Sequence, residues 1–197
     1  MIGNNKKLKK GLTLIELLVS IAIFGFLIVG LIGMFSSAVN AQQSVLQNQE
    51  ILNQGSYVTE YMDRAIRMAL RDDVGDCTKD YVNDKNYNVS SGSITFLAYD
   101  VADPGYKCKR FYLEDNVIME QKSADTNADN LEEGVPITSS KVKVSAFNVF
   151  VYGDTSNSQP IVTFVIDMES NSPRRLDPLP KMIFQTSISQ RNLNVGN

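Results

Sequence analysis

The stretch that decides the fold lies near the N-terminus, where residues 9–35 read KKGLTLIELLVSIAIFGFLIVGLIGMF. Its last 24 residues, Leu12–Phe35, carry a single charged side chain, that of Glu16. Glycine and serine aside, Leu17–Phe35 is apolar throughout and covers about 28 Å as a helix, close to the hydrocarbon thickness of a bilayer. A charge inside such a helix costs about 2.5–3.5 kcal/mol on insertion scales. The sequence therefore predicts a membrane helix whose one carboxylate requires a partner.

The charge distribution orients this helix. The chain has 197 residues and a net charge of −3, which argues against a broad electrostatic surface for nucleic acid. Its clustered basic residues come immediately before the apolar span: Lys6, Lys7, Lys9 and Lys10. Basic residues that flank a membrane helix stay in the cytoplasm. We therefore expect a single-pass protein whose residues from about 40 onward lie outside the cytoplasm.

Enzymatic chemistry is not indicated. The chain contains no histidine, which removes the commonest general base and the commonest transition-metal ligand. No nucleophile stands beside a recognisable base. We expect no catalytic residues, no cofactor and no metal ion, and an anchored enzyme is the least favoured of the functions considered.

Two ordinary readings of the apolar span remain open at this point. It can be a signal anchor, or it can be a cleavable secretory signal cut after Ala41, because Val39-Asn40-Ala41 offers small residues there. The apolar core of a secretory signal is usually 7–15 residues long, which is shorter than this span. Neither reading explains Glu16.

A third reading explains the basic leader, the glycine and the carboxylate together. Residues Lys10–Glu16 (KGLTLIE), continued by Leu17–Ile23, resemble the type III signal of prepilins, the precursors of type IV pilins and type II secretion pseudopilins. In that family a prepilin peptidase cuts after the glycine and methylates the new N-terminus, and the mature chain carries glutamate at its fifth position. Leu12 replaces the commoner phenylalanine, and Gly25, Gly30 and Gly33 occupy a helix in which major pilins commonly have a proline.

This resemblance assigns roles to three residues. It implies cleavage between Gly11 and Leu12, N-methylation of Leu12, and pairing of Glu16 with the amino terminus of Leu12 in the same or a neighbouring subunit. Partners would be prepilin peptidase and other pilins or pseudopilins of a hetero-oligomeric filament. A buried charge persists when it is paired, so such a filament would accommodate the carboxylate.

Beyond the span the sequence predicts an α+β head. Apolar residues recur every three or four positions through Ser36–Leu70, so we expect an amphipathic helix that packs on the head through Tyr61, Ala65 and Ala69 and ends at residues 72–76, with Gly75 as terminator. The expected divisions are a leader (1–11), a transmembrane and filament-core helix (12–35), the amphipathic half of the helix (36–72) and an extracytoplasmic antiparallel β head (73–197).

Alternating, β-rich runs predict the strands of the head. They are Ser93–Tyr99, Cys108–Leu113, Val117–Glu120, Val142–Tyr152, Ile161–Met168 and Met182–Arg191. Glu114-Asp115-Asn116 is expected to form a hairpin turn. One helix followed by successive hairpins is typical of an α+β fold with an antiparallel sheet, which is the pilin-like arrangement. The segment Arg110–Glu120 also resembles the "YRLENGxLxR" hairpin of J-type minor pseudopilins and related minor pilins.

Two features of the head suggest a disulfide and a metal site. Cys77 and Cys108 lie on the exported side, where disulfides persist, and a bridge would close a loop of about 30 residues; two free thiols are the alternative. Asp125–Asn130 resembles the opening of a calcium loop, but its sixth position is Asn130 instead of glycine and its twelfth is Pro136 instead of glutamate. Glu132 and Glu133 could ligate in another geometry, yet a solvated acidic loop is favoured.

The sequence thus favours a minor type IV pilin or pseudopilin that assembles by its N-terminal helix. The alternative is a filament-tip or membrane-anchored module that binds DNA, a surface or a secreted substrate. The only cationic cluster of the head is Arg174-Arg175 with Lys181, and a solvated turn explains it equally well.

Overall fold

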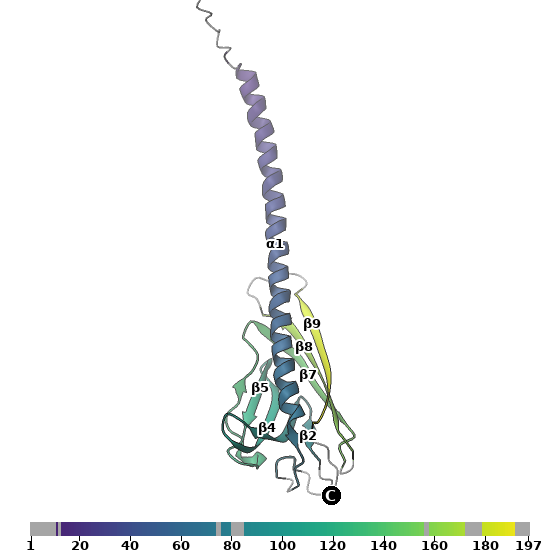
Figure 1. Ribbon diagram of the computed structural model, residues 1–197. Coiled ribbons are helices and arrows are strands. Elements are labelled where there is room, and N and C mark those ends of the chain that lie inside the picture. The colour runs from purple at the N-terminus through teal and green to yellow at the C-terminus, as the bar shows by residue number, and fades with distance from the viewer. Residues whose placement is uncertain are drawn as a thin grey trace, which may run out of the picture. The chain divides into compact units, whose positions relative to one another are not determined.

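The computed structural model describes residues 11, 13–73, 76–79, 85–155, 158–171 and 179–191 (Figure 1). The chain divides into two compact units, Met1–Ser44 and Val45–Asn197. Helix α1, Leu14–Arg67, contributes to both units, and all the strands belong to the second. The predicted α+β class, with a long N-terminal helix packed on antiparallel strands, is confirmed.

Within the second unit one stripe of α1 is buried. Its members recur every three or four residues: Ile51, Gly55, Val58, Met62 and Ile66. This spacing places them on a single helix face. The expected stripe was therefore slightly wrong: Tyr61 and Ala65 flank the buried face and are only partly covered, while Ala69 is buried but belongs to a strand.

The helix ends earlier than the periodicity predicts. It stops at Arg67, and β1, Ala69–Leu70, pairs with Ala98 and Leu97 of the first sheet. Side chains and backbone from distant segments satisfy the free carbonyls, because the Tyr87 hydroxyl donates to Ile66 O at 3.0 Å and Arg191 N donates to Arg67 O at 2.9 Å. Tertiary partners thus end the helix, and the predicted terminator, Gly75, lies outside the described residues.

The strands form two antiparallel sheets instead of one. The first has the order β1-β3-β4-β5-β6, with β2 also on β3, and the second has the order β7-β8-β9. The remaining elements are β2 Tyr87–Ser90, β3 Ser93–Asp100, β4 Gly105–Glu114, β5 Val117–Lys122, the 3₁₀ turn η1 Ala128–Asn130, β6 Val135–Pro136, β7 Val142–Tyr152, β8 Ile161–Ser170 and β9 Lys181–Ser189. All six predicted strands are present, and β1, β2 and β6 were not predicted.

Local chemistry explains the turn between β4 and β5. Asp115 and Asn116 both have positive φ, 48° and 64°, as a two-residue type I′ turn requires. Aspartate and asparagine tolerate this left-handed region better than most residues. The predicted hairpin turn is therefore confirmed.

A bulge keeps β7 facing the core. Val144 pairs with Met168 and Ala146 pairs with Asp167, so one extra residue, Ser145, is inserted opposite β8. Without it, the two-residue alternation could not direct both Val144 and Phe147 inward. The resulting core joins α1 to both sheets, with Ile51, Val58, Met62, Ile66, Ile94, Phe96, Phe111, Ile118, Val144, Phe147, Phe164 and Ile166 among its buried members.

Gly55 of α1 packs against Phe184 of the second sheet. A Cβ at this position would overlap the ring of Phe184 from β9. The ring therefore lies directly on the helix backbone, where only glycine leaves room for it.

We predict that Gly55→Ala destabilises the protein. In an open helix position this change would stabilise by about 1 kcal/mol, but displacing a packed ring costs about 1–3 kcal/mol, so the net effect should be a melting temperature lower by a few degrees. Thermal unfolding of the full chain in detergent measures it. Gly105→Ala is the control, because a Cβ there meets nothing within 4 Å. A Gly55→Ala variant as stable as the Gly105→Ala variant would contradict this packing.

Candidate functional site

The N-terminal turn of α1 is capped by Thr13. Its hydroxyl oxygen accepts a hydrogen bond from Glu16 N at 3.3 Å, and its carbonyl accepts one from Leu17 N at 3.1 Å. Thr13 is therefore the N-cap, and Glu16 occupies the third helical position. Thr-Leu-Ile-Glu matches the capping-box pattern, in which that glutamate supports the helix start. Sequence reasoning missed Thr13, although the pattern was visible.

The Glu16 side chain is exposed at the start of this helix. A negative charge in the first turn is favoured by the helix dipole. Among the described residues no ion pair to this carboxylate is present, and Ser20 donates its hydroxyl hydrogen to the Glu16 carbonyl at 2.7 Å. Gly11 is also exposed, whereas Leu12 lies outside the described residues. The predicted pairing of Glu16 with the Leu12 amine therefore stays a prediction.

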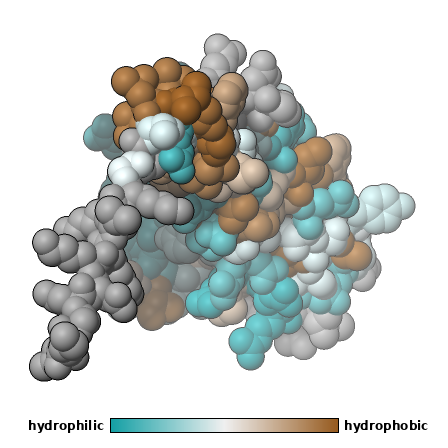
Figure 2. All heavy atoms as spheres, turned by 90° about the horizontal axis from the view of Figure 1, so that it is seen from above, coloured by the Kyte–Doolittle hydropathy of each residue, from teal (hydrophilic) through white to brown (hydrophobic). Residues whose placement is uncertain are grey.

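The helix segment after Glu16 presents apolar side chains on every face. From Leu17 to Phe35 each residue is exposed, and the exposed fraction of the Phe26 side chain reaches 83%. Figure 2, which looks from above, shows these apolar side chains in brown at the surface. By length and composition α1 is the one helix of the described chain that could cross a membrane. Such a surface is unfavourable in water and favourable in contact with lipid or with other apolar helices.

Comparison with known proteins identifies this segment. The family model of the prokaryotic N-terminal methylation motif matches residues 6–32. The N-terminus is a prepilin-type methylation signal. It implies processing by a prepilin peptidase and assembly with other pilins, and with the apolar helix it supports membrane anchoring of an outward-facing head. No curated protein and no solved structure gives a significant match.

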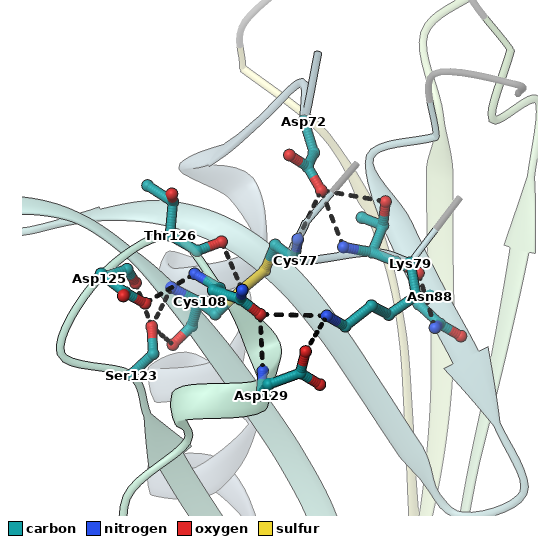
Figure 3. Close-up of a disulfide and its surroundings, with 11 residues drawn as sticks. Asp72, Cys77, Lys79, Asn88, Cys108, Ser123, Asp125, Thr126 and Asp129 are labelled. Atoms are coloured by element: carbon teal, nitrogen blue, oxygen red, sulfur yellow. Dashed lines mark hydrogen bonds and ion pairs between the residues drawn. A yellow bond between two sulfur atoms is a disulfide. The ribbon is translucent and has the colours of Figure 1, made fainter. Parts of the chain in front are cut away.

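The head of this prepilin-like chain contains the predicted disulfide. Cys77 and Cys108 are bonded, with their Cα atoms 5.6 Å apart, and both are fully buried (Figure 3). The bond ties the segment that follows β1 to β4. It closes 31 positions of the chain, which corresponds to about 3–4 kcal/mol in the chain-entropy model.

A buried carboxylate fixes the backbone around Cys77. Asp72 accepts hydrogen bonds from Cys77 N at 2.9 Å and Thr78 N at 2.8 Å, and another from the Thr78 hydroxyl at 3.1 Å. Asn88 of β2 in turn donates to Thr78 O at 2.7 Å. Hydrogen bonds to Asp72 and from Asn88 therefore hold the segment around Cys77 in addition to the disulfide.

The calcium-like loop is closed by the protein's own donors. Asp125 accepts from Asn127 N and from the Asn130 amide, and these bonds lower its pKa. The ammonium of Lys79 lies 3.0 Å from Asn127 Oδ1 and 2.8 Å from Asp129 Oδ2 (Figure 3). The lysine cation thus binds two side-chain oxygens of this loop. Within the described residues no group of three or more acidic or cysteine side chains is placed to hold a metal.

A second polar group connects α1 with the first sheet. The Tyr61 hydroxyl donates to Glu120 Oε2 at 2.7 Å. Burial of Tyr61 raises its pKa, and this bond raises it further. Asp100 lies beside Lys109 and Lys122 at 3.1 and 3.0 Å. Burial alone would raise the pKa of Asp100, but hydrogen bonds from the two lysines hold it well below its usual range. Sequence reasoning missed this network because its members are far apart in the chain.

Of the suggested cationic cluster, only Lys181 lies in the part of the chain that the structure describes. Lys181 lies 2.7 Å from Asp167 of the neighbouring strand, so its charge is matched there. Arg174 and Arg175 lie outside the described residues.

We predict that loss of the disulfide lowers the free energy of unfolding by about 3–4 kcal/mol. The double variant Cys77→Ala with Cys108→Ala, compared with the native chain by denaturant unfolding, measures the change. Adding a reductant should destabilise the native chain and leave the double variant unaffected. Equal stability of the two proteins under oxidising conditions would show that the Asp72 hydrogen bonds hold this segment without the bond.

Proposed function

We propose that this protein is a minor type IV pilin or pseudopilin. It is cleaved after Gly11, N-methylated at Leu12, and assembled through its N-terminal helix into a pilus or a secretion pseudopilus. The observation that carries the proposal is the exposed apolar surface of α1, which surrounds a single carboxylate, that of Glu16, in the first turn of the helix. A plain membrane anchor requires the apolar surface but does not require the charge of Glu16.

The position of Glu16 supports a specific partner. Cleavage after Gly11 would leave Leu12 as the first residue, with its amine immediately before the Thr13 cap. An amine and a carboxylate in an apolar surrounding attract each other strongly, because neither is screened by water. A neighbouring subunit that supplied its Leu12 amine would remove the cost of burying Glu16. The same contact would set the register between adjacent helices.

The proposal of a minor subunit rests on the head. The β4–β5 hairpin covers the region that resembles J-type minor pseudopilins, and its type I′ turn lies where that resemblance has its Asn-Gly pair. The head is also held by the Cys77–Cys108 disulfide and by the contact of Lys79 with Asp129. Secretion, motility and DNA-uptake machines all use subunits of this kind.

Replacement of Glu16 tests the proposal, and the position of this residue in a capping-box pattern makes the choice of variant important. Glutamine also serves at the third position of a capping box, so Glu16→Gln keeps the cap and removes the charge. Glu16→Ala removes both. We expect both variants to reach the membrane, and both to be reduced at least about tenfold in sheared filaments, measured by immunoblot against the cell-bound fraction.

Ser20→Ala is the matched control, because it removes a polar group one turn along the same helix and leaves the charge in place. It should be incorporated like the native chain. If Glu16→Gln were incorporated normally while Glu16→Ala was not, Glu16 would act as a cap, and the pairing with the Leu12 amine would be wrong.

A further inference from the structure

A partly open cavity of about 360 Å³ lies between the end of α1 and the part of the first sheet next to the β3–β4 turn. Its volume is in the range of sites that bind small ligands. One wall is apolar and includes Tyr61 and Ala65 of α1, Met68 immediately after the helix, and Ala98 of β3. Apolar walls with a few convergent polar groups are typical of ligand sites.

The polar side of the cavity has more cationic than anionic groups. Within the described residues it is lined by Arg64, Lys109 and Lys122, and by a single carboxylate, that of Asp100. Arg64 is already paired with Glu60, one turn earlier on α1. The two lysines therefore share one carboxylate, which leaves a surplus of one positive charge in a chain whose net charge is −3.

The two lysines also lie opposite each other in the sheet. Lys109 of β4 and Lys122 of β5 are register partners. Like charges directly opposite each other destabilise a pair of strands. Only 12% of the Lys109 side chain and 36% of the Lys122 side chain are exposed, so water screens this repulsion incompletely. Such a pair requires anions beside it, and the described part of the chain supplies one.

Asp100 cannot take up the remaining charge, because its carboxylate is fully used. Its Oδ2 lies 3.1 Å from Lys109 Nζ and 3.0 Å from Lys122 Nζ. Its Oδ1 accepts from Ala102 N at 2.9 Å and from Asp103 N at 3.4 Å. A carboxylate has about four acceptor sites, whereas each ammonium has three donors. No second acceptor contacts either lysine among the described residues, so donors remain for a ligand in the cavity.

We propose that this cavity binds a monoanionic carboxylate that is attached to a small apolar group. One carboxylate would neutralise the surplus charge and accept from both ammonium groups, whereas a phosphate, with a charge near −2, would exceed it. The apolar group would pack on Ala65, Met68 and the ring of Tyr61, whose hydroxyl is already bonded to Glu120. This inference goes beyond the proposed function and does not depend on it.

The same chemistry is offered by a free small acid and by the C-terminal residue of another polypeptide. The probe is 4-fluorobenzoate, and its binding to the full chain in detergent is measured by broadening of its ¹⁹F signal. We expect saturable binding with a Kd on the order of 1 mM, as for other ligands of this size. Displacement by acetyl-Gly-Gly-Phe with a free carboxylate, but not by its amide, would make a chain terminus the source. Binding of the benzoate without such displacement would make it a free acid.

Four variants separate the charged from the apolar contribution. Lys109→Met and Lys122→Met each remove the surplus charge and leave Asp100 one ammonium partner, so each should weaken binding at least about tenfold. Ala65→Leu keeps both lysines and fills the apolar wall, and it should weaken binding similarly. Lys141→Met is the matched control, because this exposed lysine lies outside the cavity, and it should bind like the native chain.

Thermal unfolding checks that each variant is folded, and either lysine variant is sufficient if the other misfolds. No saturable binding to the native chain up to about 10 mM would overturn the proposal, since a site of this size and charge should bind more tightly. Equal binding by the folded lysine variants and the Lys141→Met control would also overturn it. So would equal binding of 4-fluorobenzyl alcohol, which has the ring but not the charge.

Discussion

The head depends on the packing of one helix stripe against two sheets. Ile51, Val58, Met62 and Ile66 supply the side chains that join the sheets into one core, and Gly55 allows the ring of Phe184 to reach the helix backbone. The strands alone would form two small sheets, each with an uncovered apolar face. The helix stripe covers both, which is why its spacing is kept strictly at three and four residues. The disulfide and the Asp72 hydrogen bonds then fix the segment that leaves this core.

Before residue 36 the same helix is apolar on every face instead of on one stripe. A stripe is sufficient where one face meets a core, but a helix exposed on every face to lipid or to other helices must be apolar all round. The single charged residue between Leu14 and Phe35 is Glu16, which lies in the first turn of the helix, where the helix dipole makes a carboxylate least costly. The change in sequence near residue 36 therefore reflects a change of surroundings, and the charge lies close to the proposed cleavage site.

The sequence predicted those parts of the fold that local chemistry determines. Alternation located the six main strands, and Asp115-Asn116 located the turn, because positive φ selects few residue types. Long-range partners decided the remainder. Periodicity extended the helix to Leu70, but pairing with β3 turned Ala69 and Leu70 into a strand. The division into two sheets was not predictable either, since it depends on long-range contacts of β7, such as the hydrogen bond from Val144 N to Asn116 O of the first sheet. At the candidate site, the motif predicted Gly11, Leu12 and Glu16, whereas Lys79 became visible only when the fold brought it to Asn127 and Asp129.

The central claim is that the chain is processed as a prepilin, and the mass of its mature N-terminal peptide tests this most directly. The protein is isolated from the membrane fraction of its own host, digested, and analysed by tandem mass spectrometry. The account predicts a chain that begins at Leu12, with one methyl group on the α-amino nitrogen. A chain that still begins at residue 1 would identify a plain signal anchor. A chain that begins at Gln42 would identify an ordinary secretory signal, and either result would contradict the account.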